Sequence, residues 1–263
     1  MTKKRIVVKI GTNALMKDSR INKRLISDLA EDLCVVRQKG MDVILVTSGA
    51  IGFGIELLGI GFPKDVTTQQ AMAAIGQNGL MHEYKKAFAK HNQLTAQLLL
   101  TQYNFTNKKS FTDLSNSIER LLELGAIPII NENDAVSIEA LSEEKKFSDN
   151  DGLAALVATN FGADVLVILT DVDGIYSDNP KKNKDATKIN GIEGLSKIMI
   201  IEGEKSEYGL GGIKSKIAAV KKALDSGVSA IVCKPGKSAV SDSLDNRSSG
   251  SVFLIEKIET RTG

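Results

Sequence analysis

Short apolar segments of strand length recur along the chain, and they constrain its fold more than any other feature. A strand that is apolar along its whole length is buried on both faces, which is typical of parallel sheets covered by helices. The segments are rich in Val, Ile and Leu and occupy residues 6–8, 43–46, 97–100, 127–130, 165–169, 230–233 and 252–255.

Helical spacing separates several of these segments. Leu25, Leu29 and Leu33 repeat every four residues. A second helix is expected between an N-cap at Thr112 and a stop at Gly125. Apolar strands that alternate with helices make this an α/β protein.

The composition excludes several classes of protein. With 42% apolar and 25% charged residues, the chain is neither disordered nor collagen-like. The formal net charge of +2 leaves no electrostatic footprint for nucleic acid or a membrane surface. Any bound anion must therefore be held by a local site.

The cellular location is predicted from what the chain lacks. Cys34 and Cys233 belong to no CxxC pair, and they are expected to be buried thiols in a reducing compartment. The basic start, residues 1–5, is not followed by the apolar region of a signal peptide, and no apolar run approaches the roughly 20 residues of a membrane span. A cytoplasmic location is expected.

Ligands of open α/β sheets bind beyond the carboxyl ends of the strands, so the residues there carry the functional information. Lys9 precedes a Gly-Thr turn, which suits a phosphate, although alone it could be a solvated lysine at a strand end. Residues 47–52 are small and glycine-rich, which lets the backbone approach an anion or simply makes a tight turn. The four polar residues 131–134 are too many for a plain turn and suggest ligand recognition.

Two later segments carry carboxylates and lysines. Asp149 or Asn150 could cap the following helix, which leaves the carboxylate of Asp151 to orient lysines or to contact a metal-bound phosphate. Residues 211–216 place two glycines and two lysines at a helix start, where a phosphate could be cradled. The spacing is not that of a P-loop, and no strand is followed by GxGxxG.

The chain has few histidines that could act in catalysis or bind a metal. His82 and His91 are the only histidines, so neither a zinc site nor a Ser-His-Asp triad is expected. Lysines, carboxylates and glycines without a histidine base suit phosphoryl transfer to an acceptor that is already ionised.

Taken in order, these segments resemble the amino acid kinase family and, within it, the glutamate 5-kinases. The series covers almost the whole chain, and Asn-Glu-Asn-Asp-Ala-Val is the segment typical of the glutamate 5-kinases. The segments are Val-Lys-Ile-Gly-Thr at 8–12, Val-Thr-Ser-Gly-Ala-Ile at 46–51, Asn-Glu-Asn-Asp-Ala-Val at 131–136, Asp-Asn-Asp at 149–151, Leu-Thr-Asp at 169–171 and Gly-Gly-Ile-Lys-Ser-Lys at 211–216.

The resemblance implies a three-layer α-β-α sandwich with a mainly parallel central sheet. Residues 1–263 would form one kinase domain, with an acceptor-binding lobe at about 1–160 and a nucleotide-binding lobe at about 161–263. The implied reaction is ATP-dependent phosphorylation of the γ-carboxylate of L-glutamate to γ-glutamyl phosphate, the first step of proline biosynthesis. Mg²⁺ would bridge the nucleotide phosphates without a protein ligand set. Feedback inhibition by proline and assembly into a homo-oligomer are expected with it.

The resemblance also assigns residues to the acceptor and to catalysis. Ser48, Asp134 and Asn150 would bind glutamate. Lys9 and Lys216 would flank the transferring phosphoryl group, and Asp151 would hold both lysines in position.

A longer set would bind the nucleotide. It comprises Lys9, Thr170, Asp171, Leu210, Gly211, Gly212, Ile213, Lys214, Ser215 and Lys216.

Two departures from the family pattern are expected to matter. Leu210 stands where many relatives have a threonine, so a side-chain hydroxyl contact is not expected there. Residues 250–253 look like the end of the kinase domain, and no small RNA-binding-like domain is expected after them.

Other functions stay open. Kinases of the same fold that act on aspartate, N-acetylglutamate, carbamate or UMP are the nearest alternatives. A nucleotide-binding sensor without turnover is a second class, although it would not need both Lys9 and Lys216. A dehydrogenase is a distant third, because its glycine fingerprint is absent.

Overall fold

The computed structural model describes residues 3–136, 150–178, 183–195, 211–245 and 250–255. Its centre is a seven-stranded sheet in the order β5-β6-β4-β1-β7-β8-β9, parallel except for the antiparallel β8–β9 pair. All seven predicted apolar segments form strands. They are β1 (Arg5–Ile10), β4 (Asp42–Val46), β5 (Thr95–Leu100), β6 (Ile127–Glu132), β7 (Val165–Leu169), β8 (Ser229–Cys233) and β9 (Ser251–Phe253).

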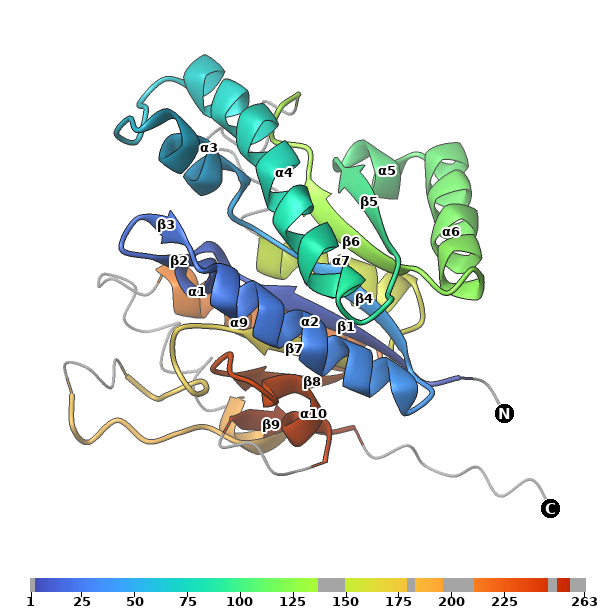
Figure 1. The fold of residues 1–263 in the computed structure, drawn as a ribbon. Coiled ribbons are helices and arrows are strands. Elements are labelled where there is room, and N and C mark those ends of the chain that lie inside the picture. Colours follow the sequence, from blue (N-terminus) through green and yellow to red (C-terminus); the bar gives the residue numbers. More distant parts are fainter. Residues whose placement is uncertain (1–2, 137–149, 179–182, 196–210, 246–249, 256–263) are drawn as a thin grey trace.

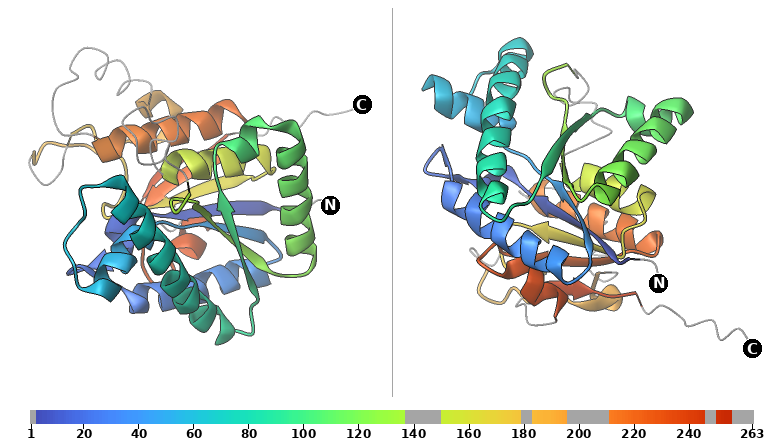
Figure 2. Two further views of the ribbon diagram at one scale, coloured as in Figure 1. Left: turned by 90° about the horizontal axis from the view of Figure 1, so that it is seen from above. Right: turned by 45° about the vertical axis from the view of Figure 1, so that its right-hand side comes forward.

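Helices cover both faces of this sheet (Figures 1 and 2), which confirms the predicted three-layer sandwich. One face packs against α6 (Lys108–Glu123), α7 (Asn150–Asn160) and α9 (Gly211–Asp225). The other face packs against α2 (Lys23–Gln38), α4 (Val66–Ala89) and α10 (Ala239–Leu244). Further elements are α1 (Thr12–Leu15), the hairpin β2 (Met16–Lys17) and β3 (Arg20–Ile21), α3 (Ala50–Leu58) and α5 (Tyr103–Thr106).

Strand β1 shows how the alternation of side chains divides the core. Val7 belongs to the apolar cluster under α6, α7 and α9. Ile6, Val8 and Ile10 belong to the cluster under α2 and α4. Because alternate residues of a strand share a face, Lys9 lies on the same face as Val7, the one covered by α7 and α9.

The start of α6 differs from the prediction. The helix begins at Lys108, and the side chain of Asn107 caps it by accepting the backbone N–H of Ser110 at 3.0 Å. Thr112 is therefore not the N-cap, and its hydroxyl donates to the carbonyl of Lys108 inside the helix at 3.0 Å. A threonine hydroxyl can satisfy itself within a helix in this way, so its presence alone does not mark a helix start.

Glycines bring α3 and α4 into backbone contact. A Cβ on Gly76 would lie 1.8 Å from the carbonyl oxygen of Ala50, and a Cβ on Gly54 would lie 2.1 Å from that of Met72. No other residue fits at these positions without moving one helix away from the other. The contact fixes the middle of α4 against the segment that follows β4.

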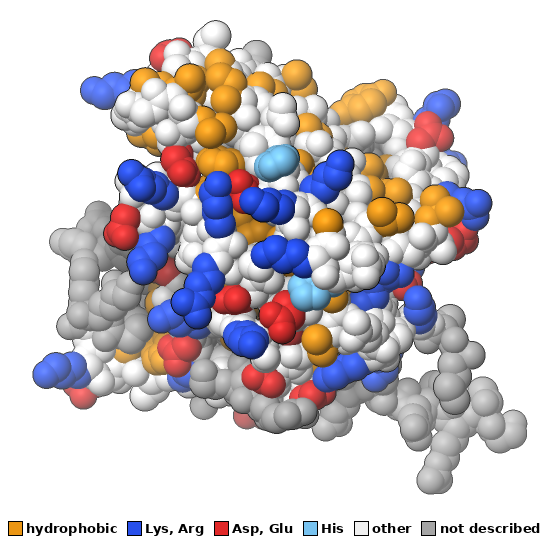
Figure 3. Space-filling model, viewed as in Figure 1, with side chains coloured by type: hydrophobic (Ala, Val, Ile, Leu, Met, Phe, Trp, Pro, Cys, Tyr) orange, Lys and Arg blue, Asp and Glu red, His pale blue; other side chains and the backbone are white. Residues whose placement is uncertain are grey.

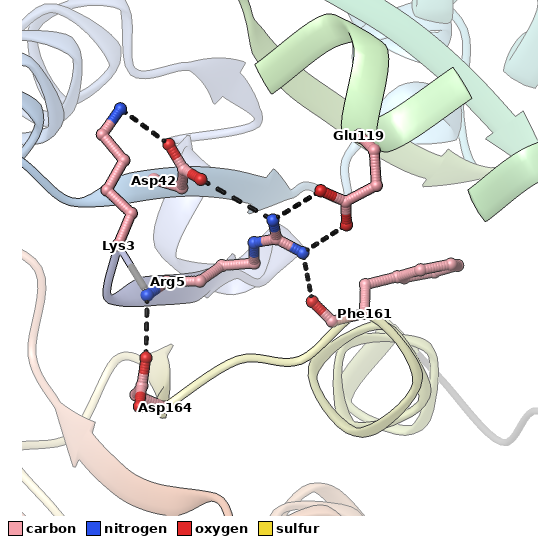
Figure 4. Close-up of polar contacts among 6 residues, drawn as sticks. All are labelled: Lys3, Arg5, Asp42, Glu119, Phe161 and Asp164. Atoms are coloured by element: carbon pink, nitrogen blue, oxygen red, sulfur yellow. Dashed lines mark hydrogen bonds and ion pairs between the residues drawn. The ribbon is translucent and has the colours of Figure 1, made fainter. Parts of the chain in front are cut away.

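At the amino-terminal edge of the sheet, Arg5 joins four elements (Figure 4). Its guanidinium donates twice to the carboxylate of Glu119 on α6, at 2.6 and 2.8 Å, and once to the carbonyl of Phe161 after α7, at 2.6 Å. It also lies 3.6 Å from the carboxylate of Asp42 on β4, while its own backbone N–H donates to Asp164 at 2.9 Å. Hydrogen bonding from Glu119 raises the pKa of Arg5 against the opposing effect of burial.

The surface seen in Figure 3 mixes Lys and Arg with Asp and Glu over its lower half, in keeping with the small net charge. Apolar side chains are exposed at the end of α3 and in the loop that leads to α4, where Leu57 and Phe62 are 53% and 69% exposed. In the part of the chain that the structure describes, no helix combines the length and apolar character needed to cross a membrane.

The close packing of α3 on α4 gives a stability prediction. We expect Gly76→Ala to lower the free energy of unfolding by roughly 1–3 kcal/mol, because the added methyl group overlaps a backbone oxygen. Gly61→Ala is the control, since no atom lies within 4 Å of a Cβ at that position. Urea denaturation of both variants measures the difference, and equal stabilities would contradict the contact.

Candidate active site

Four parallel strands, β6, β4, β1 and β7, end side by side at the carboxyl edge of the sheet. Lys9 is the penultimate residue of β1 and pairs in register with Val46 of β4 and Ile168 of β7. Lys9 is 5% exposed, so its long side chain lies between the sheet and α7 and does not reach bulk water. A lysine buried this deeply requires a nearby anion.

That anion is Asp151 in the first turn of α7, which is completely buried. Its Oδ1 lies 2.5 Å from Nζ of Lys9, and its Oδ2 lies 3.0 Å from Nζ of Lys216 on α9. The hydroxyl of Ser215 donates to the same Oδ2 at 3.0 Å. The three predicted catalytic residues therefore meet at one point, although they come from three distant parts of the chain.

The charges of this cluster determine what it can bind. Burial alone would raise the pKa of Asp151, but the ammonium groups of Lys9 and Lys216 outweigh it and leave that pKa lowered. Two ammonium groups and one carboxylate sum to one positive charge. The start of α9 adds the partial positive charge of a helix N-terminus. An anionic ligand of phosphate type suits this position.

Asn150 connects the carboxyl ends of the neighbouring strands β4 and β6 through hydrogen bonds. Its Nδ2 donates to the carbonyl of Thr47 at 2.7 Å, to the hydroxyl of Ser48 at 2.8 Å and to Oδ1 of Asn131 at 2.9 Å. The turn after Ser48 depends on Gly49, whose φ of 97° is unfavourable for other residues. Two of the predicted acceptor residues, Ser48 and Asn150, are thus in direct contact.

The third predicted acceptor residue, Asp134, lines a neighbouring pocket of about 360 Å³ between α4, β5 and the residues after β6. Neither Ser48 nor Asn150 is among the residues that line this pocket. The lining combines small and apolar side chains with amides and carboxylates. It consists of Ala50, Ala73, Ala74, Gln77, Asn78, Met81, Gln97, Leu99, Glu132, Asn133, Asp134 and Ala135.

The predicted nucleotide residues are only partly gathered. Thr170 follows β7, is buried, and donates its hydroxyl to Asp171 at 3.2 Å, whereas Asp171 is exposed. Gly211 and Gly212 open α9, as predicted. Ile213 packs on the core, Lys214 is exposed, and Leu210 lies outside the described residues. The binding roles of this set stay predictions.

Two side chains that lie at the site, Asn131 and Gln77, were not predicted individually from the sequence. Asn131 was recognised only as part of a polar segment, although it is the first polar residue after the apolar run of β6 and is 1% exposed. Gln77 lies in the middle of α4, where nothing local distinguishes it from a surface glutamine, yet it is 7% exposed and bonded to Asn131. Only the contact across the fold identifies it.

Both oxygens of Asp151 contact lysines. In the described ranges, no group of three or more His, Cys, Asp or Glu could hold a metal ion.

Comparison with known proteins identifies the family and the fold of this chain. The model of the family described as "Amino acid kinase family" matches residues 4–234. The chain belongs to the amino acid kinase family. Carbamate kinase from Giardia lamblia bound to AMP-PNP has the same fold, with a TM-score of 0.68 and 17% identity over 97% of this chain and 99% of that one.

Curated relatives show which group of the family this chain resembles. Glutamate 5-kinase of Lactiplantibacillus plantarum is 42% identical over 84% of this chain and 85% of its own length. Glutamate 5-kinase of Enterococcus faecalis is 38% identical over 95% of this chain and 94% of its own. The predicted resemblance to the glutamate 5-kinases is confirmed.

The lysine cluster gives a kinetic prediction for this kinase. We expect Lys9→Ala and Lys216→Ala each to lower kcat by roughly 10²–10³-fold, with a much smaller change in the KM of the acceptor, because each removes a positive charge aimed at the reacting group. Steady-state release of ADP measures both constants. Lys221→Ala, at an exposed position of the same helix, is the control. Near-normal turnover in either active-site variant would remove that lysine from the mechanism.

Proposed function

We propose that the chain transfers the γ-phosphoryl group of ATP to the γ-carboxylate of L-glutamate, giving γ-glutamyl phosphate for proline biosynthesis. The relatives named glutamate 5-kinase support this assignment. The observation that carries it is the buried cluster in which Asp151 holds Lys9 and Lys216. It presents two ammonium groups at the strand ends, and in the contacts given for the described residues neither is bonded to a histidine base.

The chemistry needs no such base. A carboxylate acceptor is already ionised at neutral pH, so its oxygen can attack phosphorus without losing a proton. The remaining tasks are alignment of the two substrates and neutralisation of charge in the transition state. Lys9, from β1, and Lys216, from α9, would contact the transferring group from two sides. Asp151 would fix both ammonium groups, so little rearrangement is needed as charge develops.

The acceptor would lie beside this cluster. Ser48 and Asn150 would contact it close to the reacting oxygen, because Asn150 directly precedes Asp151. Asp134, in the neighbouring pocket, would bind the α-ammonium group. Thr170, Asp171 and the stretch from Leu210 to Lys216 would line the nucleotide site. In this arrangement residues at about 1–160 serve the acceptor and those at about 161–263 serve the nucleotide.

The proposal also covers the location, the metal ion, the regulation and the assembly of the enzyme. We propose a cytoplasmic location, Mg²⁺ bound with ATP, and feedback inhibition by proline. We also propose a homo-oligomer, which the exposed apolar side chains of the α3–α4 end support, because self-association would cover them.

An ATP-dependent assay with hydroxylamine tests the function. Hydroxylamine converts an acyl phosphate into a stable hydroxamate, whereas coupled ADP release reports transfer to any acceptor. L-glutamate is compared with L-aspartate, N-acetyl-L-glutamate and UMP. We expect hydroxamate with glutamate and little product with the others. ADP release with another acceptor alone would overturn the substrate, and ATP binding without turnover on any of them would indicate a sensor.

A further inference from the structure

Gln77 is a buried amide for which neither the proposed reaction nor the predicted site residues account. It lies in the middle of α4 and is among the residues that line the pocket of Asp134. Its Oε1 accepts a hydrogen bond from Nδ2 of Asn131 at 2.8 Å. Its Nε2 is buried and has no hydrogen-bond partner among the described residues. A buried N–H group without an acceptor is rare in folded proteins and requires an explanation.

The orientation of this amide follows from its neighbours. The backbone N–H of Glu132 can only donate, and it donates to Oδ1 of Asn131 at 2.9 Å. Nδ2 of Asn131 is therefore the atom that faces Gln77, so the atom of Gln77 facing it must be the oxygen. The NH₂ group of Gln77 consequently points away from Asn131 and is left to find an acceptor elsewhere.

The backbone holds Gln77 rigidly in this place. Gly76, its immediate neighbour, is in backbone contact with Ala50, the first residue of α3. Ala50, Ala73 and Ala74 form small walls of the same pocket. Since α4 cannot shift without losing the α3 contact, the donor of Gln77 is preorganised, which lowers the cost of using it in binding.

A chain of amides connects Gln77 with the catalytic cluster. Asn150, next to Asp151, donates to Asn131, and Asn131 donates to Gln77. Gln77 is thus the member farthest along this chain from Lys9 and Lys216. Resting on the proposed function, we propose that Gln77 donates its Nε2–H to the α-carboxylate of the acceptor amino acid and thereby determines specificity for that group. Asp134 takes the α-ammonium, and the γ-carboxylate reaches the lysines.

The decisive variant is Gln77→Glu, which keeps the size of the side chain and the acceptor for Asn131. It replaces the donor by a negative charge that repels an α-carboxylate. We expect the KM for L-glutamate to rise roughly 10- to 100-fold, as for loss of a hydrogen bond to a charged group, with kcat and the KM for ATP little changed.

A substrate with the complementary change makes the test specific. L-glutamic acid α-amide keeps the γ-carboxylate, but its α-group has no negative charge and carries N–H donors beside a single carbonyl oxygen. The wild-type protein should prefer glutamate to this amide by roughly 10-fold or more in kcat/KM. Gln77→Glu should abolish or reverse that preference, because the introduced carboxylate accepts from the amide. Hydroxamate formation measures both substrates in the same way.

Two further variants exclude a merely structural or general electrostatic effect. Gln97→Glu places the same charge on the same pocket at an exposed position, and it should leave the preference for glutamate intact. Gln77→Met is apolar and similar in length, so it should lose the preference without reversing it. It also carries the test if Gln77→Glu fails to fold.

The experiment distinguishes an error in the proposed role of Gln77 from an error in the proposed function. If the wild-type protein makes no hydroxamate from glutamate, the proposed function is wrong. If the wild-type protein is active but Gln77→Glu and Gln77→Met keep its preference for glutamate over the α-amide, the inference is wrong. An equal change of preference in Gln97→Glu would also overturn it.

Discussion

The contact of one buried carboxylate with two lysines is the interaction on which the rest of the site depends. Asp151 joins Lys9 of the central strand β1 to Lys216 of α9, and it is itself the second residue of α7. Removing one partner from such a cluster leaves a buried charge uncompensated, which is strongly unfavourable. The cluster therefore holds the start of α7 and the first turns of α9 against β1, and it sets the positive charge that a phosphoryl group would meet.

The parallel sheet explains why this cluster can form at all. Neighbouring strands end at one edge, so residues 9, 47, 131 and 170 approach each other although they are far apart in sequence. The opposite edge carries a different charged contact, in which Arg5 joins β1, β4, α6 and the end of α7 (Figure 4). Apolar strands fill the space between the two edges. Charge thus anchors the same helix, α7, at its start through Asp151 and at its end through Arg5.

Much of this could be predicted from the sequence, for identifiable reasons. All seven strands and the helix at Gly211 were predicted, because continuous apolar runs and glycine at a helix start are local signals. The Thr112 cap was wrong, since a hydroxyl that could cap a helix can equally bond inside one. Lys9, Asp151 and Lys216 were found through motif resemblance, and their contact needed the fold. Gln77 could not be predicted, because its burial comes from contacts of α4 with α3 and Asn131 that no local pattern encodes.

Two ammonium groups keep Asp151 ionised, and the stability that this contact contributes depends on pH. Because the pKa of Asp151 is lowered in the folded protein, its ionised form stabilises the fold above the unfolded pKa of about 3.9. That stabilisation is lost as the pH falls through the lower folded value. The direct measurement is a ¹³C NMR titration of the aspartate carboxyl carbons, with Asp151 assigned by its disappearance in Asp151→Asn. We expect a pKa for Asp151 that lies below the usual aspartate value and that rises in Lys216→Ala. A pKa at or above the usual value, unchanged in that variant, would contradict this expectation.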